Sequence, residues 1–372
     1  MIATARALRS RSLAVALVGL IATVLVACSN TAPPAPATHT TAGGSSAVTP
    51  TASATARAKP GTYTNPVFEH DAPDPGVLRA RDGTYYAYTT QSVYLDIVEI
   101  DILASTDLVH WRRVGDAFPH APAWVIGGAA GDMWAPHPLY WQRRYLLFYA
   151  GRQQSDGSMA IGVASASSPR GPFHDLGRPL LERSKGQPTY TAIDPFVLAD
   201  KGHLWIYWGS NDQPIRVARL DDAVTRVIGE PRVLVAPVPS RGSYGGLVEA
   251  AWVLPHADWY YLFYSVGDCC SEDANYSVFV ARSRAPDGPF EGGPDNPVLH
   301  QNSHFWAVGH NATAVDDAGQ DWLIYHARLR DTVSEDRVLM LDRIDWRDGW
   351  PRVDDHTGAS WTAQKVPDMH IR

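Results

Sequence analysis

The apolar positions of this chain are gathered into short aromatic and β-branched runs, which are separated by turns rich in Gly, Pro and Asp. This pattern predicts β-strands rather than helices. One run recurs five times, as YYAYTT, YLLFYAG, LWIYWGS, YYLFYSVG and WLIYHAR, starting at Tyr85, Tyr145, Leu204, Tyr260 and Trp322. Successive starts lie 56 to 62 residues apart, so the chain carries an internal repeat.

A second strand-like run follows each copy, and the second and fourth of these end in the related segments SPRGPF and APDGPF. Five repeat units with several strands each predict an all-β fold, namely a single five-bladed β-propeller. An α/β barrel would need long helices with a 3.6-residue period, and the sequence shows none. Two stacked β-sandwiches would explain the strands but not the period.

A short motif lies 10 to 12 residues before each aromatic run. The five motifs centre on Asp74, Trp134, Asp194, Glu249 and His310. Because each blade of a propeller begins with its innermost strand, we expect these residues to meet at the mouth of the central channel. The sequence therefore predicts an active site in that channel.

Glu249 differs from the other four because its neighbours in LVEAAWVL are apolar and nothing basic lies in its strand. A buried carboxylate without a partner costs several kcal/mol or stays protonated. Two carboxyl groups facing one slot, with a third that tunes one of them, can cleave a glycosidic bond. We therefore predict Glu249 as the general acid, Asp74 as the general base, and Asp194 as the residue that raises the pKa of the acid.

Each candidate taken alone also has a structural interpretation. Asp-Pro pairs such as those at Asp74 and Asp194 often begin turns. A His with apolar neighbours, such as His310, is usually a core residue whose nitrogens are hydrogen-bonded. Trp134 would equally fit packing between blades. The shared place of these residues in the repeat is what favours a catalytic function.

The motifs together resemble glycoside hydrolase family 43 over Tyr63 to about Arg352. The segment NPVFEHDAPDPGVLR resembles the first-blade signature, DMWAPHPLYW the Trp-Ala-Pro motif, AIDP the modulator motif and VEAAW the acid motif. The resemblance implies an inverting hydrolase with the three roles assigned above. It also implies that His310 lies near a cation, often calcium, at the channel centre, and that no organic cofactor is needed.

The sequence specifies the substrate less closely than the reaction, because Gly76, His137 and Ala250 depart from the residues that are usual in the family. The adjacent Cys269 and Cys270 resemble a loop of arabinan-cleaving members, whereas the DAPDP start resembles the arabinofuranosidase and xylosidase branches.

We predict cleavage of arabinofuranosyl linkages, in α-L-1,5-arabinan or arabino-oligosaccharides of plant or cell-wall origin. The alternatives are a β-xylosidase or other furanosidase and, from a different class, a non-catalytic sugar-binding propeller. Trp134, Phe68 and Tyr244 are the predicted sugar-stacking residues.

The N-terminal residues have the pattern of an export signal. Basic residues precede a short apolar run, LAVALVGLIATVLVA, that ends at Cys28. LVAC resembles a bacterial lipobox, so we predict a lipoprotein-type signal peptide over 1–28 with Cys28 lipidated; ordinary cleavage and a membrane anchor are the alternatives. A disordered Thr/Ala/Ser/Pro tether over 29–61 and a catalytic propeller over 62–365 would follow. We expect an exported protein, lipid-anchored to the outer face of the cell membrane or secreted.

Charge and cysteine content limit the binding partners and the disulfides that we expect. The net charge of -7 at pH 7 provides no basic surface for nucleic acid. We expect a monomer that touches the membrane only through its N-terminal lipid. Beyond Cys28, the chain has only Cys269 and Cys270, which as neighbours can close only a small ring and cannot staple distant segments. Two buried thiols are the alternative.

Overall fold

The computed structural model describes residues 61–92, 99–127, 132–183, 186, 191–210, 213–237, 246–332 and 336–370. The predicted signal peptide with Cys28, the tether up to residue 60, and Tyr244 lie outside these residues. Within the described ranges, the one helical element is the short 3-10 helix η2 (Asp354–His356). No helix in that part of the chain is long and apolar enough to cross a bilayer.

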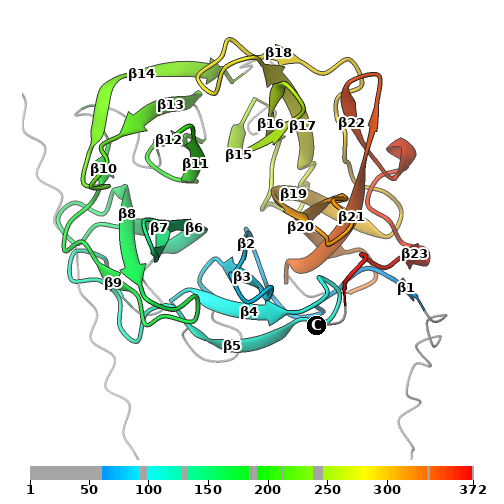
Figure 1. Ribbon diagram of the computed structural model, residues 1–372, viewed down its shortest axis with the longest axis horizontal. Coiled ribbons are helices and arrows are strands. Elements are labelled where there is room, and N and C mark those ends of the chain that lie inside the picture. The colour runs from blue at the N-terminus through cyan, green and yellow to red at the C-terminus, as the bar shows by residue number, and fades with distance from the viewer. Residues whose placement is uncertain are drawn as a thin grey trace, which may run out of the picture. The chain divides into compact units, whose positions relative to one another are not determined.

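Five antiparallel sheets stand around a central axis in chain order (Figure 1). Blade one contains β2 (Gly76–Arg79), β3 (Tyr85–Thr89), β4 (Asp101–Ser105) and β5 (Arg112–Asp116). Blade two contains β6 (Met133–Trp141), β7 (Arg144–Arg152), β8 (Met159–Ala166), β9 (His174–Asp175) and β10 (Leu181–Glu182). Blade three contains β11 (Phe196–Asp200), β12 (His203–Trp208), β13 (Ile215–Leu220) and β14 (Val227–Val235).

Blade four contains β15 (Val248–His256), β16 (Trp259–Val266), β17 (Ser277–Ser283) and β18 (Glu291–Gly292). Blade five contains β19 (Phe305–Val315), β20 (Asp321–Leu329), β21 (Val338–Arg347) and β22 (Trp350–Val353). The first strand of every blade is the innermost one in Figure 1. This arrangement confirms the predicted all-β, five-bladed propeller.

The repeated aromatic run forms the second strand of each blade, where it is packed on both faces and is therefore almost continuously apolar. Several of its tyrosines bury their rings and donate their hydroxyls to carbonyl oxygens of a neighbouring blade. Tyr85 donates to Val315 at 2.7 Å and Tyr207 to Pro286 at 2.6 Å. The Tyr207 contact recurs at the equivalent Tyr88 of blade one, whose hydroxyl donates to the carbonyl of Pro169 on blade two, so the repeat includes a repeated inter-blade contact.

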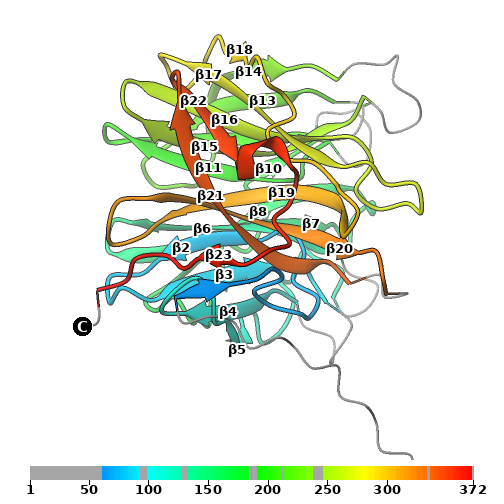
Figure 2. The same ribbon diagram turned by 90° about the vertical axis from the view of Figure 1, so that its right-hand side faces the viewer.

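The two ends of the described chain meet at blade five. The strand β1 (Thr62–Tyr63) pairs with β23 (Gln364–Lys365), and the Tyr63 hydroxyl donates to the carbonyl of Leu341 on β21 at 2.7 Å. Figures 1 and 2 show the C-terminal segment, in red, passing from blade five toward blade one. All four strands of blade five come from the C-terminal part of the chain. The ring is therefore closed by the segment at the start of the propeller, β1, which packs on β21.

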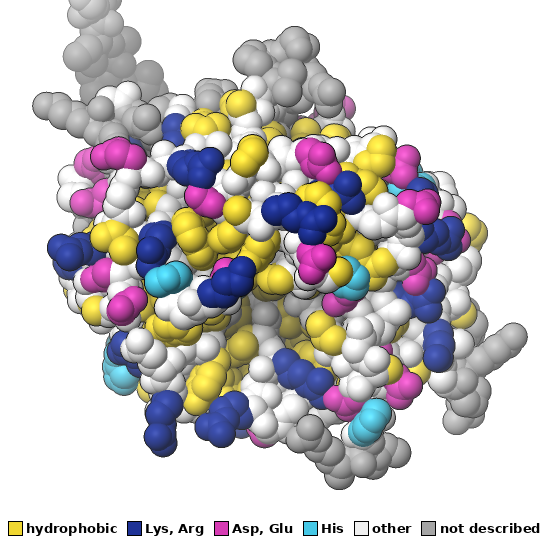
Figure 3. All heavy atoms as spheres, turned by 45° about the horizontal axis from the view of Figure 1, so that its top comes forward, with side chains coloured by type: hydrophobic (Ala, Val, Ile, Leu, Met, Phe, Trp, Pro, Cys, Tyr) yellow, Lys and Arg dark blue, Asp and Glu magenta, His cyan; other side chains and the backbone are white. Residues whose placement is uncertain are grey.

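The surface bears both signs of charge. In Figure 3, Lys and Arg side chains alternate with Asp and Glu across the face turned to the viewer. Mixed charge of this kind provides no continuous positive field for a polyanion.

Candidate active site

A cavity of about 490 Å³ lies where the inner strands of the five blades begin. It is lined by Asp74, Thr90, Trp134, Ile193, Asp194, Ser210, Leu247, Glu249, Cys269, Cys270, His310 and Arg337. The structure thus brings together the five residues at which the repeat motifs centre. All five blades contribute to this cavity.

In or just before each inner strand, the motif contains a non-glycine residue in the left-handed backbone region; β19 has a further one, Ala307 (φ 49°). The five motif residues are Asp74 (φ 53°), Ala135 (φ 49°), Asp194 (φ 56°), Ala250 (φ 56°) and His310 (φ 48°). Pairing with the second strand is irregular next to three of them, as expected for a β-bulge. Such backbone costs about 1–3 kcal/mol each and is concentrated at functional sites.

This backbone pattern refines the predicted equivalence of the five motifs. Asp74, Asp194 and His310 occupy the left-handed position, whereas Trp134 and Glu249 each come one residue before it. Counting residues back from the aromatic runs cannot detect an offset of one, because the motif spacing itself varies by two. All five side chains nevertheless line the channel cavity, although their places relative to the strand differ.

The carboxylate of Asp74 is surrounded by donors and positive charge. Thr90 Oγ1 donates to Oδ2 at 2.6 Å, and Arg337 Nη1 lies 3.0 and 3.2 Å from the two carboxylate oxygens. His310 Nδ1 is 3.2 Å from Oδ1. Burial alone would raise the pKa of Asp74, but Arg337 and His310 hold it well below its usual value. Asp74 is therefore ionised at neutral pH.

Two histidines beside Asp74 differ in protonation. Burial would lower the pKa of His310, but the charges of Asp74 and Asp194 outweigh it and raise the pKa to about 8. His326 is fully buried, and burial is the main cause that lowers its pKa to about 4. Its Nδ1 accepts the backbone N–H of Asp74 at 3.1 Å, so its own proton is on Nε2. His310 supplies charge to the base, whereas His326 fixes its backbone.

Glu249 and Asp194 are both buried carboxyl groups. The Tyr276 hydroxyl donates to Glu249 Oε1 at 2.7 Å, and the Ser210 hydroxyl donates to Oε2. The N–H of Ala250 donates to Asp194 Oδ2 at 3.1 Å. Burial raises the pKa of Glu249 against these hydroxyl contacts, while burial and the charge of Glu249 raise the pKa of Asp194. Two such groups resist carrying both charges, so the pair holds a proton at neutral pH.

The three predicted stacking residues lie in different places. Trp134 lines the cavity and packs beside Ile193 and Met159. Phe68 is packed against the core, where it forms a single β-bridge with Leu339 of β21, and it is absent from the residues that line the cavity. Tyr244 lies outside the described residues. Trp134 is thus the one described member of the three that borders the cavity.

Several residues of the site were not singled out from the sequence. The sequence did contain a signal for Thr90 and Ser210, because both follow directly on the repeated aromatic strand, in YYAYTT and LWIYWGS. Ser265 of YYLFYSVG holds a similar place and accepts the backbone N–H of His310 at 2.9 Å. Arg337 carried no such signal, since it belongs to none of the repeated runs.

The residues near His310 do not form a protein-held calcium site. Among the described residues, no group of three or more His, Cys, Asp or Glu is arranged to hold a metal ion. Calcium takes about six to eight oxygen ligands, whereas His310 offers nitrogen and lies against Asp74. No catalytic step is therefore assigned to a cation. Calcium stays a prediction of the sequence resemblance, and metal analysis of the purified protein tests it.

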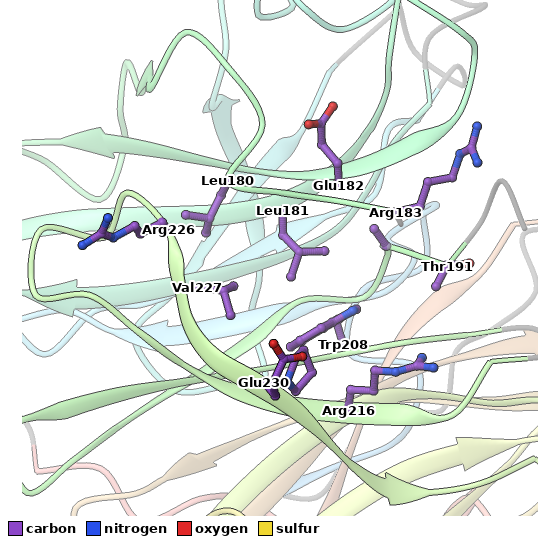
Figure 4. A pocket seen from close by; sticks show the side chains of 12 residues that line it. Leu180, Leu181, Glu182, Arg183, Thr191, Trp208, Arg216, Arg226, Val227 and Glu230 are labelled. Atoms are coloured by element: carbon purple, nitrogen blue, oxygen red, sulfur yellow. The ribbon is translucent and has the colours of Figure 1, made fainter. Parts of the chain in front are cut away.

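A second hollow, of about 560 Å³, lies between blades two and three (Figure 4). Its lining includes Leu181, Trp208, Arg216, Val227 and Glu230. It contains none of the five motif residues, although Thr191 and Ala192 on its wall lead directly into Ile193 and Asp194 of the channel cavity. We assign the chemistry to the channel cavity because carboxyl groups of opposite pKa shift face it.

Comparison with known proteins agrees with this geometry. The family model described as Glycosyl hydrolases family 43 matches residues 63–351. The extracellular exo-α-(1→5)-L-arabinofuranosidase ArbA of Cellvibrio japonicus is 29% identical over 80% of this chain and 90% of that protein. The extracellular endo-α-(1→5)-L-arabinanase 1 of Bacillus subtilis is 27% identical over 67% of this chain and 78% of its own length.

Among solved structures, a thermostable family-43 glycoside hydrolase superposes with a TM-score of 0.71 at 26% identity. The match covers 83% of this chain and 100% of that one. The similarity therefore spans the whole propeller rather than a single motif.

Proposed function

The chain belongs to glycosyl hydrolase family 43, and on that premise we propose an inverting enzyme that hydrolyses arabinofuranosyl linkages in α-L-1,5-arabinan or its oligosaccharides. One observation carries the proposal: three carboxyl groups from different blades face one cavity, and their surroundings push their pKa values apart. The pKa of Asp74 is lowered while those of Asp194 and Glu249 are raised. Such a division separates a base from an acid. Relatives that act on α-1,5-linked arabinose support the sugar.

In the proposed reaction, Asp74 accepts a proton from a water molecule as that water attacks the anomeric carbon. Glu249 gives its proton to the departing glycosidic oxygen on the opposite side of the sugar. The hydroxyls of Ser210 and Tyr276 orient Glu249. Arg337 and Thr90 hold the Asp74 carboxylate in place through hydrogen bonds. One displacement gives a product of inverted configuration.

The proposal is tested with linear α-1,5-arabinan, nitrophenyl α-L-arabinofuranoside and nitrophenyl β-D-xyloside. We expect turnover of the arabinosyl substrates, and proton NMR should show that the first anomer formed is inverted. Turnover of the xyloside alone would instead favour a β-xylosidase. Sugar binding without turnover would favour a non-catalytic propeller, and a retained anomer would remove the inverting mechanism. Product length on arabinan distinguishes endo from exo cleavage.

Replacing Asp194 with Asn should move the alkaline limb of the kcat/KM–pH profile to lower pH. The acid must be protonated, so activity is lost as pH rises through its pKa. The charge of Asp194 raises the pKa of a neighbouring acid, and Asn removes that charge. The profile is measured between pH 4 and pH 9 (roughly the range in which raised carboxyl pKa values fall). An unchanged alkaline limb would contradict a modulating role for Asp194.

We also propose that the protein is exported and that Cys28 carries the lipid. The basic residues, the apolar run and LVAC support this proposal, as does the extracellular description of both relatives named above. Expressed in a bacterium grown with labelled palmitate, the wild-type chain should take up the label, whereas Cys28→Ala should not. Absence of label from the wild-type chain, or equal labelling of the two, would count against lipidation at Cys28.

A further inference from the structure

The adjacent cysteines of blade four form a disulfide that lines the active-site cavity. Cys269 and Cys270 follow the end of β16, and Cys270 is exposed whereas Cys269 is half-buried. A bond between neighbouring residues closes no loop of the unfolded chain, so it cannot give the usual entropic stabilisation of a disulfide. Any effect of this disulfide on the enzyme therefore comes from the surface that it presents to the cavity.

The loop that carries the disulfide is held by its own hydrogen bonds. The Asp268 carboxylate accepts the backbone N–H groups of Cys270 at 2.8 Å and Ser271 at 3.1 Å, and it also accepts the Ser271 hydroxyl. Asn275 Oδ1 accepts the N–H of Asp268 at 2.9 Å. These contacts fix the loop from the side, so the sulfur atoms keep a defined position at the cavity wall.

The disulfide is also supported from beneath by an apolar cluster that reaches the acid. Cys269 packs against the cluster of Leu247, Ala274, Tyr276 and Ala307. Tyr276 of that cluster donates its hydroxyl to Glu249 at 2.7 Å. The cluster that supports Cys269 thus contains Tyr276, the residue that donates to the proposed general acid.

The roles of the acid and the base identify the side of the cavity that the disulfide borders as the leaving-group side. The general acid gives its proton to the departing oxygen, so the leaving-group sugar lies against the blade of Glu249. The base lies on blade one, on the side of the attacking water. A disulfide is apolar and, like other protein sulfur, polarizable, so it can pack against the C–H groups of a sugar ring. The wall beside the leaving-group sugar therefore contains an apolar surface of fixed position.

We propose that the Cys269–Cys270 disulfide is a contact surface for the pentose on the leaving-group side and favours oligosaccharides over substrates without that sugar. The proposal rests on the function proposed above. It names a specificity-determining contact, and it gives the disulfide no part in proton transfer.

The test compares two substrates that differ only on the leaving-group side when the terminal arabinosyl group is the one released, namely α-1,5-arabinotriose and α-L-arabinofuranosyl fluoride. The double variant Cys269→Ala/Cys270→Ala should lose about tenfold in kcat/KM on arabinotriose, mainly through a higher KM, because a pocket contact of this size is worth about that much. On the fluoride it should stay within about twofold of wild type. Glu272→Ala, which alters an exposed residue of the same loop that does not line the cavity, is the matched control and should change neither value.

Equal losses on both substrates, or no loss on arabinotriose, would overturn the proposal. If the wild-type enzyme cleaves neither substrate, the proposed function itself fails and this contact falls with it. If it cleaves both and the double variant keeps the wild-type ratio of kcat/KM between the two substrates, the function stands and the contact alone is refuted.

Reduction of the folded wild-type enzyme tests the same contact without a substitution. A water-soluble phosphine breaks the S–S bond and is oxidised to its oxide; water supplies the oxygen and the two protons that convert both sulfurs to thiols. A gain of two free thiols per chain over the unreduced enzyme confirms the reaction. We expect a selective loss on arabinotriose that reoxidation reverses. Two thiols with unchanged arabinotriose kinetics would contradict a role for the closed ring.

Discussion

Replacing Asp74 with Asn is expected to lower kcat by about 10³- to 10⁴-fold on every substrate, whatever its leaving group. Asn keeps the shape of the side chain but cannot accept a proton from water. The loss should be uniform because the water must be activated regardless of how easily the leaving group departs. Steady-state rates on arabinan, arabinotriose and a nitrophenyl arabinofuranoside measure the effect.

Two controls separate chemistry from damage to the fold. Thr90→Val removes the 2.6 Å hydrogen bond to Asp74 but keeps the carboxylate, so it should cost only about tenfold. Removing Asp74 also leaves the Arg337 charge without its partner, so circular dichroism and thermal unfolding should verify that the variant folds.

Chemical rescue gives a readout that a merely structural residue would not change. In Asp74→Ala, azide can enter the space of the missing carboxylate and attack the sugar without being deprotonated. We expect an arabinosyl azide of inverted configuration and a partial recovery of rate. Retention of more than about one tenth of wild-type kcat by Asp74→Asn would exclude Asp74 as the base.

Replacing Glu249 with Gln should produce losses that depend on the leaving group. We expect about 10²- to 10⁴-fold on arabinan, whose departing alkoxide needs a proton, and a much smaller loss on a dinitrophenyl arabinofuranoside, which leaves as a stable anion. The alkaline limb of the pH profile should also disappear for the activated substrate. Equal losses across leaving groups would mean that Glu249 is not the acid.

Tyr276→Phe provides the matched control for the acid. The Tyr276 hydroxyl donates to Glu249 and lowers its pKa, although burial has the larger, opposite effect. Without the hydroxyl the ionised form loses a donor, so the pKa rises and the alkaline limb should move to higher pH. Asp194→Asn is expected to move it to lower pH. Opposite shifts in the two variants would locate the titrating proton on the pair of Glu249 and Asp194.

Much of the fold could be predicted because its signal is local and repeated. Each blade packs its second strand on both faces, which demands an almost continuous apolar run such as YYAYT of β3. That demand recurs once per blade, so the period is visible without knowing any contact between blades. The same period places Asp74, Asp194 and Glu249 near the start of an inner strand, where propeller geometry brings them together.

What the sequence by itself determined is therefore the blade period, the order of the motifs and the identity of three carboxyl groups beside a histidine. Only the tertiary structure decided which groups tune them. Arg337 and Asp74 are 263 residues apart and meet because the ring closes, through the early segment that packs on β21. The one-residue offset of Glu249 depends on a backbone bulge that residue counting cannot resolve. Local periodicity specifies a blade, but the charge that each carboxyl group carries depends on neighbours that only ring closure supplies.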